Sequence, residues 1–335
     1  MSRIRTGGLR ATVLLCLLAL VACTPLVQEI GLRDAAPRLD ERFFFTADGT
    51  ALPLRRWLPD NPGHDTPPRA LIVALHGYND YSNAFAESAA AWQEDGIATW
   101  AYDQRGFGGH SPRGVWAGAG AMAADLGEFV AALSDRYPGV PVWLLGSSMG
   151  GAVVILALAS PDPPAVAGVI LAAPAVWGRE AMPAGYTASL WLAAHSLPWY
   201  RASGRNLRRI PSDNRAMLEA LFRDPSVLRD SRVDTLFGLV DLMDRALAGA
   251  GGVAVPVLYL YGENDQIVPP GPTVTAIGRI PAARRRVAVY ENGWHMLLRD
   301  LQADVVRHDI AAWIAAPDAP LPSGADRRDW RGLAD

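Results

Sequence analysis

The sequence predicts an α/β fold in which a mostly parallel sheet is covered by helices on both faces and carries an inserted helical cap. Three features lead to this expectation. Apolar runs with the length of buried strands alternate with helical stretches between residues 71 and 172, and two more occur between residues 255 and 290. A Gly-Ser-Ser-Met-Gly turn at residues 146–150 joins one of these strands to a helix. Residues 177–252 lack the alternation and have a helical pattern.

The first residues of the chain have the pattern of a targeting segment. Three arginines within the N-terminal basic region precede the apolar stretch Ala11–Leu20, which is too short to span a membrane comfortably. It continues into Leu20-Val21-Ala22-Cys23, which resembles a bacterial lipobox. This resemblance implies that residues 1–22 are a lipoprotein signal peptide and that the Cys23 thiol carries lipid. An ordinary secretory signal and an uncleaved anchor are the alternatives, and each would also export the chain.

The exported chain begins with a tether and a hairpin. Residues 23–41 are a mixed, proline-containing stretch that we interpret as the tether. The first part of the core, residues 42–176, starts with two strand-like runs, Phe43–Thr46 and Leu52–Trp57, which an Asp-Gly pair joins as in a hairpin. Proline and other turn formers then predict a loop from Asn61 to Pro68.

Buried strands alternate with helices through the rest of the core. Continuous apolar strands in this arrangement are typical of a parallel sheet covered on both faces, and polar site residues then lie beyond the carboxyl ends of the strands. The expected strands are Leu71–Leu75, Ile97–Tyr102, Val142–Leu145, Val166–Ala172, Val255–Tyr261 and Arg286–Tyr290, and the expected helices are Asn83–Glu94, Ala121–Arg136 and Ala152–Ala159.

Residues 177–252 interrupt this alternation and are predicted to form the cap. Gly249–Gly252 predicts a flexible exit from it into the second part of the core, residues 253–315. The final residues, 316–335, are polar and rich in Pro, Asp and Arg, so we expect a disordered tail. The helix-like stretches of the cap are Ala188–His195, Asn214–Phe222 and Val233–Ala248.

The composition argues against several classes of protein. A net charge of -3 offers no basic surface for nucleic acid. All 31 basic residues are arginine, which excludes Schiff-base lysines and P-loop phosphate binding. The two cysteines, Cys16 and Cys23, lie at the N-terminus, and the six histidines lack metal-ligand spacing. We therefore expect neither thiol catalysis nor a metal, and no cofactor.

The most informative motif is Gly146-Ser147-Ser148-Met149-Gly150. It joins a predicted strand to a predicted helix, which is the arrangement of a nucleophile elbow. The tight turn explains the glycines, and the helix N-terminus that follows favours developing negative charge. Ser148 is therefore the candidate nucleophile, and the Met149 backbone N–H is a candidate oxyanion donor. A Gly-rich turn without chemistry is the alternative.

A serine hydroxyl is a weak nucleophile that needs a base and an orienting carboxylate. Asp265 and His295 come directly after the last two predicted strands, where their side chains can converge on Ser148. Their order along the chain, Ser then Asp then His, is the order that a nucleophile elbow of this kind uses. Glu263 and Asp103 are the alternative acids.

Several segments make the chain similar to the α/β-hydrolase superfamily, and within it to the branch of monoacylglycerol lipases, lysophospholipases and S33-type serine aminopeptidases. The resemblance implies an eight-stranded, mostly parallel sheet with helices on both faces and an inserted cap. It also implies that the Tyr78 amide is the second oxyanion donor, that His76 is not the base, and that the Arg105-Gly-Phe-Gly turn borders the site without reacting. The matching segments are His76-Gly77, Tyr102–Gly108, Gly146–Gly150, Gly262–Pro269 and Gly293–His295.

Candidate substrate contacts lie mostly in the cap. Trp177 and Trp191 are candidates for an acyl groove near Ser148, with a role in the cap core as the alternative. His76 is a candidate contact from the core. The arginines of segment 201–209 are candidates to meet a phosphate head group or an anionic membrane, and a solvated helix face is the alternative.

Together these features predict a serine hydrolase that cleaves carboxylic esters, with monoacylglycerol or lysophospholipid-like lipids as substrates, through Ser148, His295, Asp265 and an acyl-enzyme. A peptidase of small peptides, an acyltransferase on the same triad and a catalytically silent surface-binding protein are the alternatives. The expected partners are a lipid-like ester and the membrane reached through lipidated Cys23, without nucleic acid or metal. The expected location is the bacterial cell envelope, and the sequence leaves the oligomeric state open.

Overall fold

A computed structural model describes residues 24–59, 67–204 and 209–334 of the chain. The predicted signal peptide, the lipidation site Cys23, most of the predicted loop 61–68 and two arginines of the cap, Arg205 and Arg208, lie outside the described residues. Within those described ranges, no helix is long and apolar enough to cross a membrane.

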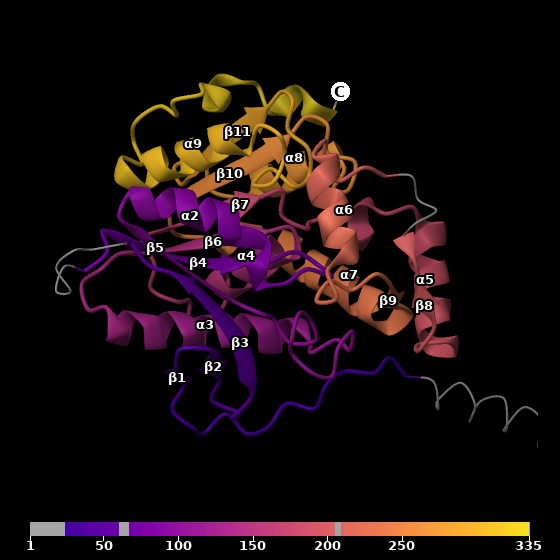
Figure 1. Cartoon of the computed structure of the whole chain (residues 1–335). Helices are drawn as coiled ribbons and strands as arrows, with labels where there is room; N and C mark the ends of the chain where they lie inside the picture. The colour runs from indigo at the N-terminus through magenta and orange to yellow at the C-terminus, as the bar shows by residue number, and fades with distance from the viewer. Residues whose placement is uncertain (1–23, 60–66, 205–208, 335) are drawn as a thin grey trace, which may run out of the picture.

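The centre of the molecule is one mostly parallel sheet with the strand order β1-β2-β3-β5-β4-β6-β7-β10-β11 (Figure 1). β2 and β3 form the predicted hairpin, and β3 joins β5 in antiparallel orientation. From β5 to β11 all neighbouring strands run parallel. The strands are β1 Arg38–Leu39, β2 Phe43–Phe45, β3 Ala51–Trp57, β4 Ala70–Leu75, β5 Ile97–Tyr102, β6 Val142–Ser147, β7 Gly168–Ala172, β10 Val257–Gly262 and β11 Arg285–Tyr290.

The sheet of the described residues has nine strands rather than the expected eight. The additional strand is β1, which comes from the predicted tether and pairs with β2. Other parts of the tether also pack on the core, since Arg33 forms ion pairs with Asp125 at 2.5 Å and Glu128 at 2.7 Å. The pattern missed β1 because it is two residues long, below the length at which alternation is recognisable.

Helices cover both faces of the sheet, as the apolar strands predict (Figure 1). Alternate residues of β4 belong to two separate apolar cores: Leu71, Val73 and Leu75 pack with α3 and α4, whereas Ile72 faces α2 and α9. Such alternation is the geometry of a strand buried on both sides. The core helices are α2 Ala86–Glu94, α3 Ala119–Arg136, α4 Met149–Leu158, α8 Pro270–Arg279 and α9 Ala303–Ala315.

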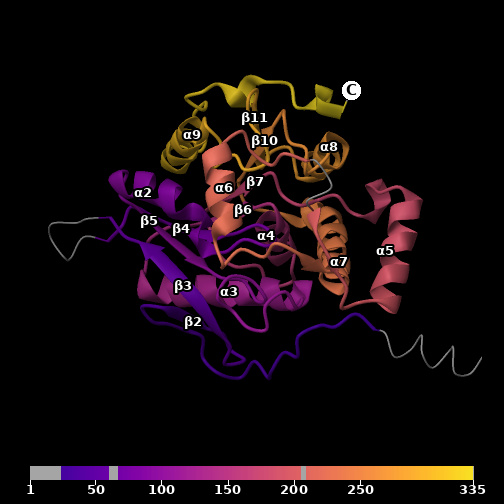
Figure 2. The same cartoon turned by 45° about the vertical axis from the view of Figure 1, so that its right-hand side comes forward.

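In the described part of the segment between β7 and β10, the α-helices are α5 Ala184–Ser196, α6 Arg215–Arg223 and α7 Val233–Gly249. Figure 2 shows α6 in front of the strands and α5 on the outside of α7. The segment is not purely helical, because β8 Arg201–Ala202 pairs with β9 Ser231–Arg232. The predicted flexible exit is a 3₁₀ turn, Ala250–Gly252, in which Ala250 is buried.

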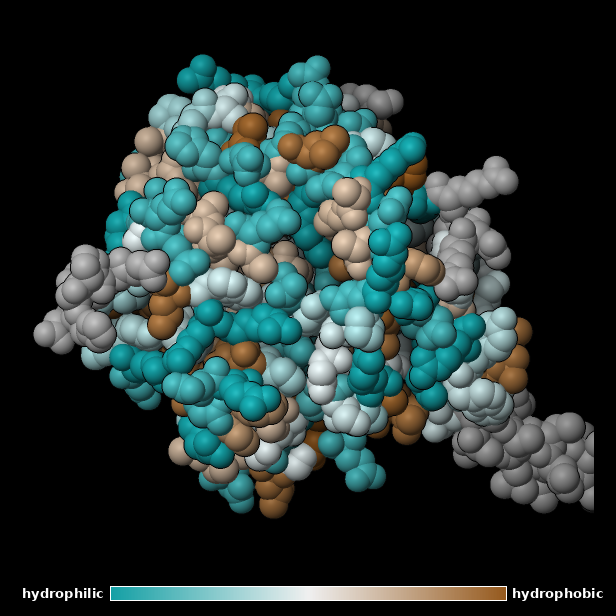
Figure 3. All heavy atoms as spheres, in the orientation of Figure 1, coloured by the Kyte–Doolittle hydropathy of each residue, from teal (hydrophilic) through white to brown (hydrophobic). Residues whose placement is uncertain are grey.

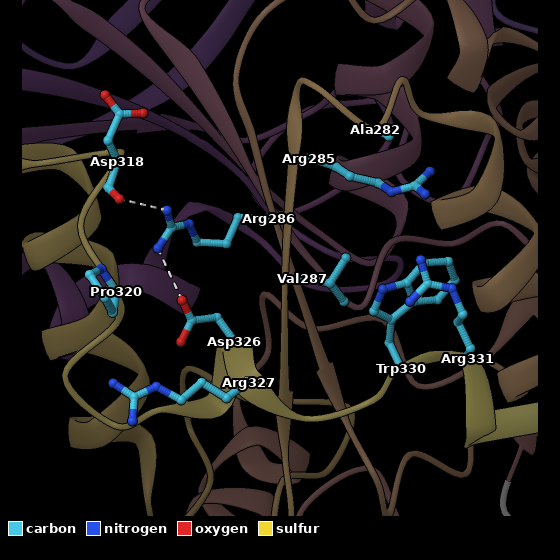
Figure 4. A pocket seen from close by; sticks show the side chains of 10 residues that line it. All are labelled: Ala282, Arg285, Arg286, Val287, Asp318, Pro320, Asp326, Arg327, Trp330 and Arg331. Carbon is cyan, nitrogen blue, oxygen red and sulfur yellow. Dashed lines mark hydrogen bonds and ion pairs between the residues drawn. The ribbon is translucent and has the colours of Figure 1, made fainter.

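The C-terminal tail is folded onto the molecule, so the expectation of disorder is wrong for residues 316–334. Arg286 of β11 donates to the Asp318 carbonyl at 3.1 Å and pairs with Asp326 at 3.0 Å (Figure 4). Leu321 and Ala325 are buried against the core. Composition suggested disorder because few residues are apolar, but one clamping arginine and two buried apolar side chains hold the segment.

Candidate active site

Ser148 stands at the turn between β6 and α4 with φ 50° and ψ −115°, a backbone conformation that non-glycine residues rarely adopt. The parallel pairing of β6 with β7 places Ser147 opposite Ala172, and the Ser148 N–H donates to the Ala172 carbonyl at 3.0 Å. A Cβ on Gly146 would lie 2.5 Å from the Cα of Gly151, so the turn excludes even a methyl group there. The geometry is that of a nucleophile elbow.

Asp265 and His295 meet at the carboxyl ends of β10 and β11. The His295 Nδ1–H donates to Asp265 Oδ2 at 2.8 Å. The other carboxylate oxygen, Oδ1, accepts the backbone N–H groups of Ile267 at 2.7 Å and Val268 at 3.0 Å. Both side chains are almost fully buried. This bonding holds the neutral imidazole as the Nδ1–H tautomer and leaves Nε2 free to accept a proton.

The two alternative acids are engaged elsewhere. Glu263 forms an ion pair with Arg328 at 2.9 Å near the surface. Asp103 is buried, and it accepts the N–H and hydroxyl of Ser82 and the N–H of Gly109. Asp103 therefore fixes loops in the core rather than a histidine.

Ser148 and His295 line the same cavity, which has a volume of about 690 Å³. Tyr78 and Trp177, the candidates for the oxyanion loop and the acyl groove, also line this cavity. Much of its wall is apolar, and the sequence analysis missed one part of this wall: Leu236, Leu239 and Met243 of α7. Their spacing of three and four residues places them on one helix face, which is the signal that would have identified them.

The two predicted oxyanion donors lie on either side of Ser148. Met149 is the first residue of α4, where a backbone N–H has no partner within the helix. The loop that carries Tyr78 passes close to the nucleophile, since a Cβ built on Gly77 would lie 3.4 Å from the Ser148 Cβ. Among the described residues, no hydrogen bond from the Tyr78 or Met149 amide to another backbone group is found outside the helices and strands.

His76 does not reach the cavity, so its candidacy as a substrate contact is wrong. The ring is fully buried, its Nε2 accepts the Gln104 N–H at 2.9 Å, and its Nδ1–H donates to the Gly77 carbonyl at 2.9 Å. Burial lowers the pKa of His76, which keeps the ring neutral. Its function is to fix the start of the loop that carries Tyr78.

Trp191 is also placed differently from the expectation. It lies on the outer side of the cap, 54% exposed, and stacks on the His195 ring at 4.4 Å. It lines a surface hollow with Met182 and Phe237 rather than the cavity of Ser148. The sequence did not reveal this because α5 is apolar around most of its circumference, so periodicity does not show which side faces the site.

The Arg105-Gly-Phe-Gly turn supports the site from behind. Arg105 is buried between Asp48 at 2.8 Å and Asp125 at 2.7 Å, and these carboxylates compensate its charge. The Phe107 ring packs edge-on against the rings of Tyr78 at 5.4 Å and His76 at 5.9 Å.

Within the described residues, no group of three or more His, Cys, Asp or Glu side chains is arranged to hold a metal ion.

The fold and the elbow define the α/β-hydrolase class of enzymes. The chain superposes on the crystal structure of a soluble variant of monoglyceride lipase from Saccharomyces cerevisiae with a TM-score of 0.68 and 22% identity, covering 87% of this chain and 98% of that chain. The family model described as serine aminopeptidase, S33, matches residues 66–302, and the chain belongs to this family.

Two curated relatives extend the comparison along most of the chain. The monoglyceride lipase of Rattus norvegicus is 28% identical over 83% of this chain and 91% of its own length. The monoacylglycerol lipase of Mycolicibacterium smegmatis is 25% identical over 82% of this chain and 97% of its own length. Both alignments are long enough to include the core and the cap together.

Proposed function

We propose that this carboxylic-ester hydrolase cleaves monoacyl lipid esters, such as monoacylglycerols or lysophospholipids, through Ser148, His295 and Asp265. The observation that carries the proposal is the 2.8 Å hydrogen bond from His295 to Asp265 at the cavity that also contains the strained Ser148. A serine nucleophile needs a base held in one tautomer by a buried carboxylate, and this pair supplies it.

The reaction proceeds in two half-reactions. His295 Nε2 takes the hydroxyl proton as Ser148 Oγ attacks the ester carbonyl carbon, and Asp265 stabilises the imidazolium that forms. The tetrahedral intermediate collapses, the alcohol leaves with the proton from His295, and an acyl-serine remains. His295 then takes a proton from water, the hydroxide attacks the acyl carbon, and the carboxylic acid leaves as Ser148 regains its proton.

The amides of Tyr78 and Met149 donate to the oxyanion in both half-reactions. Because the charge on the carbonyl oxygen develops only in the transition state, these donors contribute to kcat, with about 3 kcal/mol for each donor. The N-terminus of α4 adds its positive partial charge at the same place.

The shape of the cavity supports a lipid-like substrate. The volume of about 690 Å³ is far larger than an acetyl group requires, and Leu239, Met243 and Trp177 give it an apolar wall. The curated relatives in Rattus norvegicus and Mycolicibacterium smegmatis are named monoglyceride and monoacylglycerol lipases, which supports the same substrate class.

The surface of the cap supports work at a lipid interface. Tyr186, Trp191, Leu192 and Tyr200 are each more than half exposed on or after α5, and apolar side chains are visible at the right-hand margin of Figure 3, where α5 lies. Tryptophan and tyrosine are the side chains that favour a membrane surface. We include in the proposal that lipid on Cys23 anchors the chain to the cell envelope and brings this face to its substrate.

Hydrolysis by the full chain in detergent micelles tests the proposal. The panel contains p-nitrophenyl esters from acetyl to palmitoyl, 1-monoacylglycerol, a lysophospholipid and aminoacyl-peptide substrates, with Ser148→Ala as the matched control. Turnover that increases with acyl length and disappears in the variant is expected. Turnover of peptides alone would replace the proposal with a peptidase, and no turnover of any ester by the folded protein would refute it. The mass of the mature protein, with Cys23→Ala as the control, tests lipidation.

A further inference from the structure

Cap residues 209–214 contact both loops that carry the proposed acid and base. On the acid side, the Ile210 N–H donates to Gln266 Oε1 at 3.0 Å, and Arg209 donates to the Gln266 carbonyl. Gln266 directly follows Asp265 in the chain. The cap is therefore bonded to the residue beside the carboxylate that orients the histidine.

On the histidine side, the backbone N–H groups of the residues before and after His295 are both hydrogen-bonded. The Trp294 N–H donates to Asp300 Oδ2 at 2.7 Å, and the Met296 N–H donates to the Pro211 carbonyl at 3.0 Å. The second of these bonds reaches the cap directly. The first reaches it through one side chain, because the Ser212 hydroxyl donates to the other oxygen of Asp300 at 2.6 Å.

Two further bonds join the same segments. The Leu301 N–H donates to Asp213 Oδ1 at 2.9 Å, and the Asn214 side chain donates to the Arg299 carbonyl at 3.0 Å. Asn214 also accepts the Met217 N–H as the N-cap of α6, so the contact with the histidine loop and the start of that helix share one residue. The contact is continuous from Pro211 to Asn214.

Asp300 lies at the centre of this contact, in a buried position where an ionised carboxylate loses its hydration. It is 3% exposed, and its partner Ser212 is 1% exposed. Burial raises the pKa of Asp300 to about 6, while the bonds from Ser212 and the Trp294 amide oppose the rise. The charged groups that face it are Asp213, which disfavours its ionisation, and His295, which favours it. Packing alone would be served as well by an apolar residue, because burying a carboxylate costs desolvation free energy that its hydrogen bonds must offset.

We propose that Asp300 is a positioning residue for His295, and that the cap segment 209–214 holds Asp300 in place through Ser212. The inference rests on the proposed function. His295 must keep Nδ1 on Asp265 while Nε2 faces Ser148, so the backbone on both sides of His295 has to stay fixed. A displacement of the ring by about 1 Å costs on the order of 100-fold in rate.

The test compares Asp300→Ala, Asp300→Asn and Ser212→Ala in the full chain. The concentration of reactive sites is measured by labelling each enzyme to completion with a fluorophosphonate, and every rate is divided by that concentration. Asparagine can still accept from the Trp294 amide and donate to Ser212, whereas alanine can do neither. The matched control is Asp309→Ala, which removes a buried aspartate of α9 that accepts hydrogen bonds from the hydroxyls of Tyr290 and Ser323. Substrates are p-nitrophenyl acetate, too short to fill the acyl region of the cavity, and the best long-chain ester.

We expect Asp300→Ala to lower kcat by about tenfold to 100-fold with both esters and to leave KM nearly unchanged. Asp300→Asn is expected to recover most of this loss, because its amide can still accept from the Trp294 N–H and bond to Ser212. Ser212→Ala gives a smaller loss, and Asp309→Ala changes stability without changing kcat.

Three results would overturn the inference while wild-type hydrolysis persists. These are a kcat for Asp300→Ala within twofold of wild type, a rise in KM confined to the long ester, and an Asp300→Asn enzyme that recovers none of the activity lost in Asp300→Ala. Should Asp300→Ala fail to fold, Asp300→Asn and Ser212→Ala decide the question. Absence of ester hydrolysis in the wild type would instead refute the proposed function itself.

Discussion

Replacing Asp265 with asparagine tests how the buried carboxylate controls the protonation of His295. In the structure Oδ1 of Asp265 accepts two backbone N–H groups, from Ile267 and Val268, and Oδ2 accepts the His295 Nδ1–H. An asparagine amide has one acceptor oxygen and one donor NH₂ group. The two backbone donors therefore retain the oxygen, and the NH₂ group is directed at His295.

The size of the effect follows from this choice. Turning the amide around would leave two backbone donors without acceptors, at a cost of about 2–6 kcal/mol in total. Moving the imidazole proton from Nδ1 to Nε2 costs far less, because either nitrogen readily carries it. The Nε2 atom, which is the base in the proposed mechanism, is then protonated and cannot take the proton of Ser148. The same change in a serine protease triad lowers kcat by about 10⁴, which corresponds to roughly 5.4 kcal/mol of transition-state free energy.

The assay is the rate of p-nitrophenyl ester hydrolysis per reactive site, together with the thermal midpoint of unfolding. Asp265→Asn is expected to lose about 10⁴ in kcat while it retains the fold, because the backbone bonds to Oδ1 persist. Glu263→Gln is the control: its carboxylate lies nearby in the chain but pairs with Arg328 at the surface. The reasoning is refuted if Asp265→Asn keeps more than a tenth of the wild-type kcat.

Three other predictions concern the elbow, the cavity and the tail. Gly146→Ala should lower the free energy of unfolding in urea by more than about 1–3 kcal/mol, because its Cβ would lie 2.5 Å from the Gly151 Cα. Gly127→Ala, on the open side of α3, should leave the free energy of unfolding unchanged or raise it. Equal stabilities of the two variants would contradict the packing argument. Leu239→Trp should lower the ratio of palmitoyl to acetyl ester turnover at least about tenfold, and an unchanged ratio would exclude this helix face from acyl binding. Arg286→Ala should make the tail cleavable in limited proteolysis, unlike the exposed Arg327→Ala, and equal resistance would show that the clamp is dispensable.

The parts of the molecule that follow local rules were predictable from the sequence. The position of Ser148 in a tight strand-to-helix turn was predictable because only glycine fits at the close approaches of such a turn. The meeting of Asp265 and His295 was predictable because parallel strands bring their carboxyl ends to one edge, whatever the intervening sequence contains. These rules require only the order of strands and helices along the chain, and the apolar runs of the sequence indicate that order.

The parts that depend on long-range packing were not predictable. Trp191 and Trp177 have the same chemistry and lie in the same segment, yet only Trp177 lines the cavity with Ser148. Asp300 and Ser212 are 88 positions apart in the chain, and neither belongs to a sequence motif from which their contact could be predicted. His76 follows a strand as the sequence indicates, but its burial depends on Gln104 from the end of the neighbouring strand, a contact that the sequence does not show.

The folded tail has a consequence for how the protein behaves beside other copies of itself. β11 is the last strand of the sheet, and the outer side of such a strand offers unpaired backbone groups on which a foreign strand can grow. The 3₁₀ turn at Ala325–Arg327 lies against β11, held by Asp326 on Arg286. The final residues thus cover the border at which edge-to-edge aggregation of this sheet would begin, and a chain that ends at α9 would expose it.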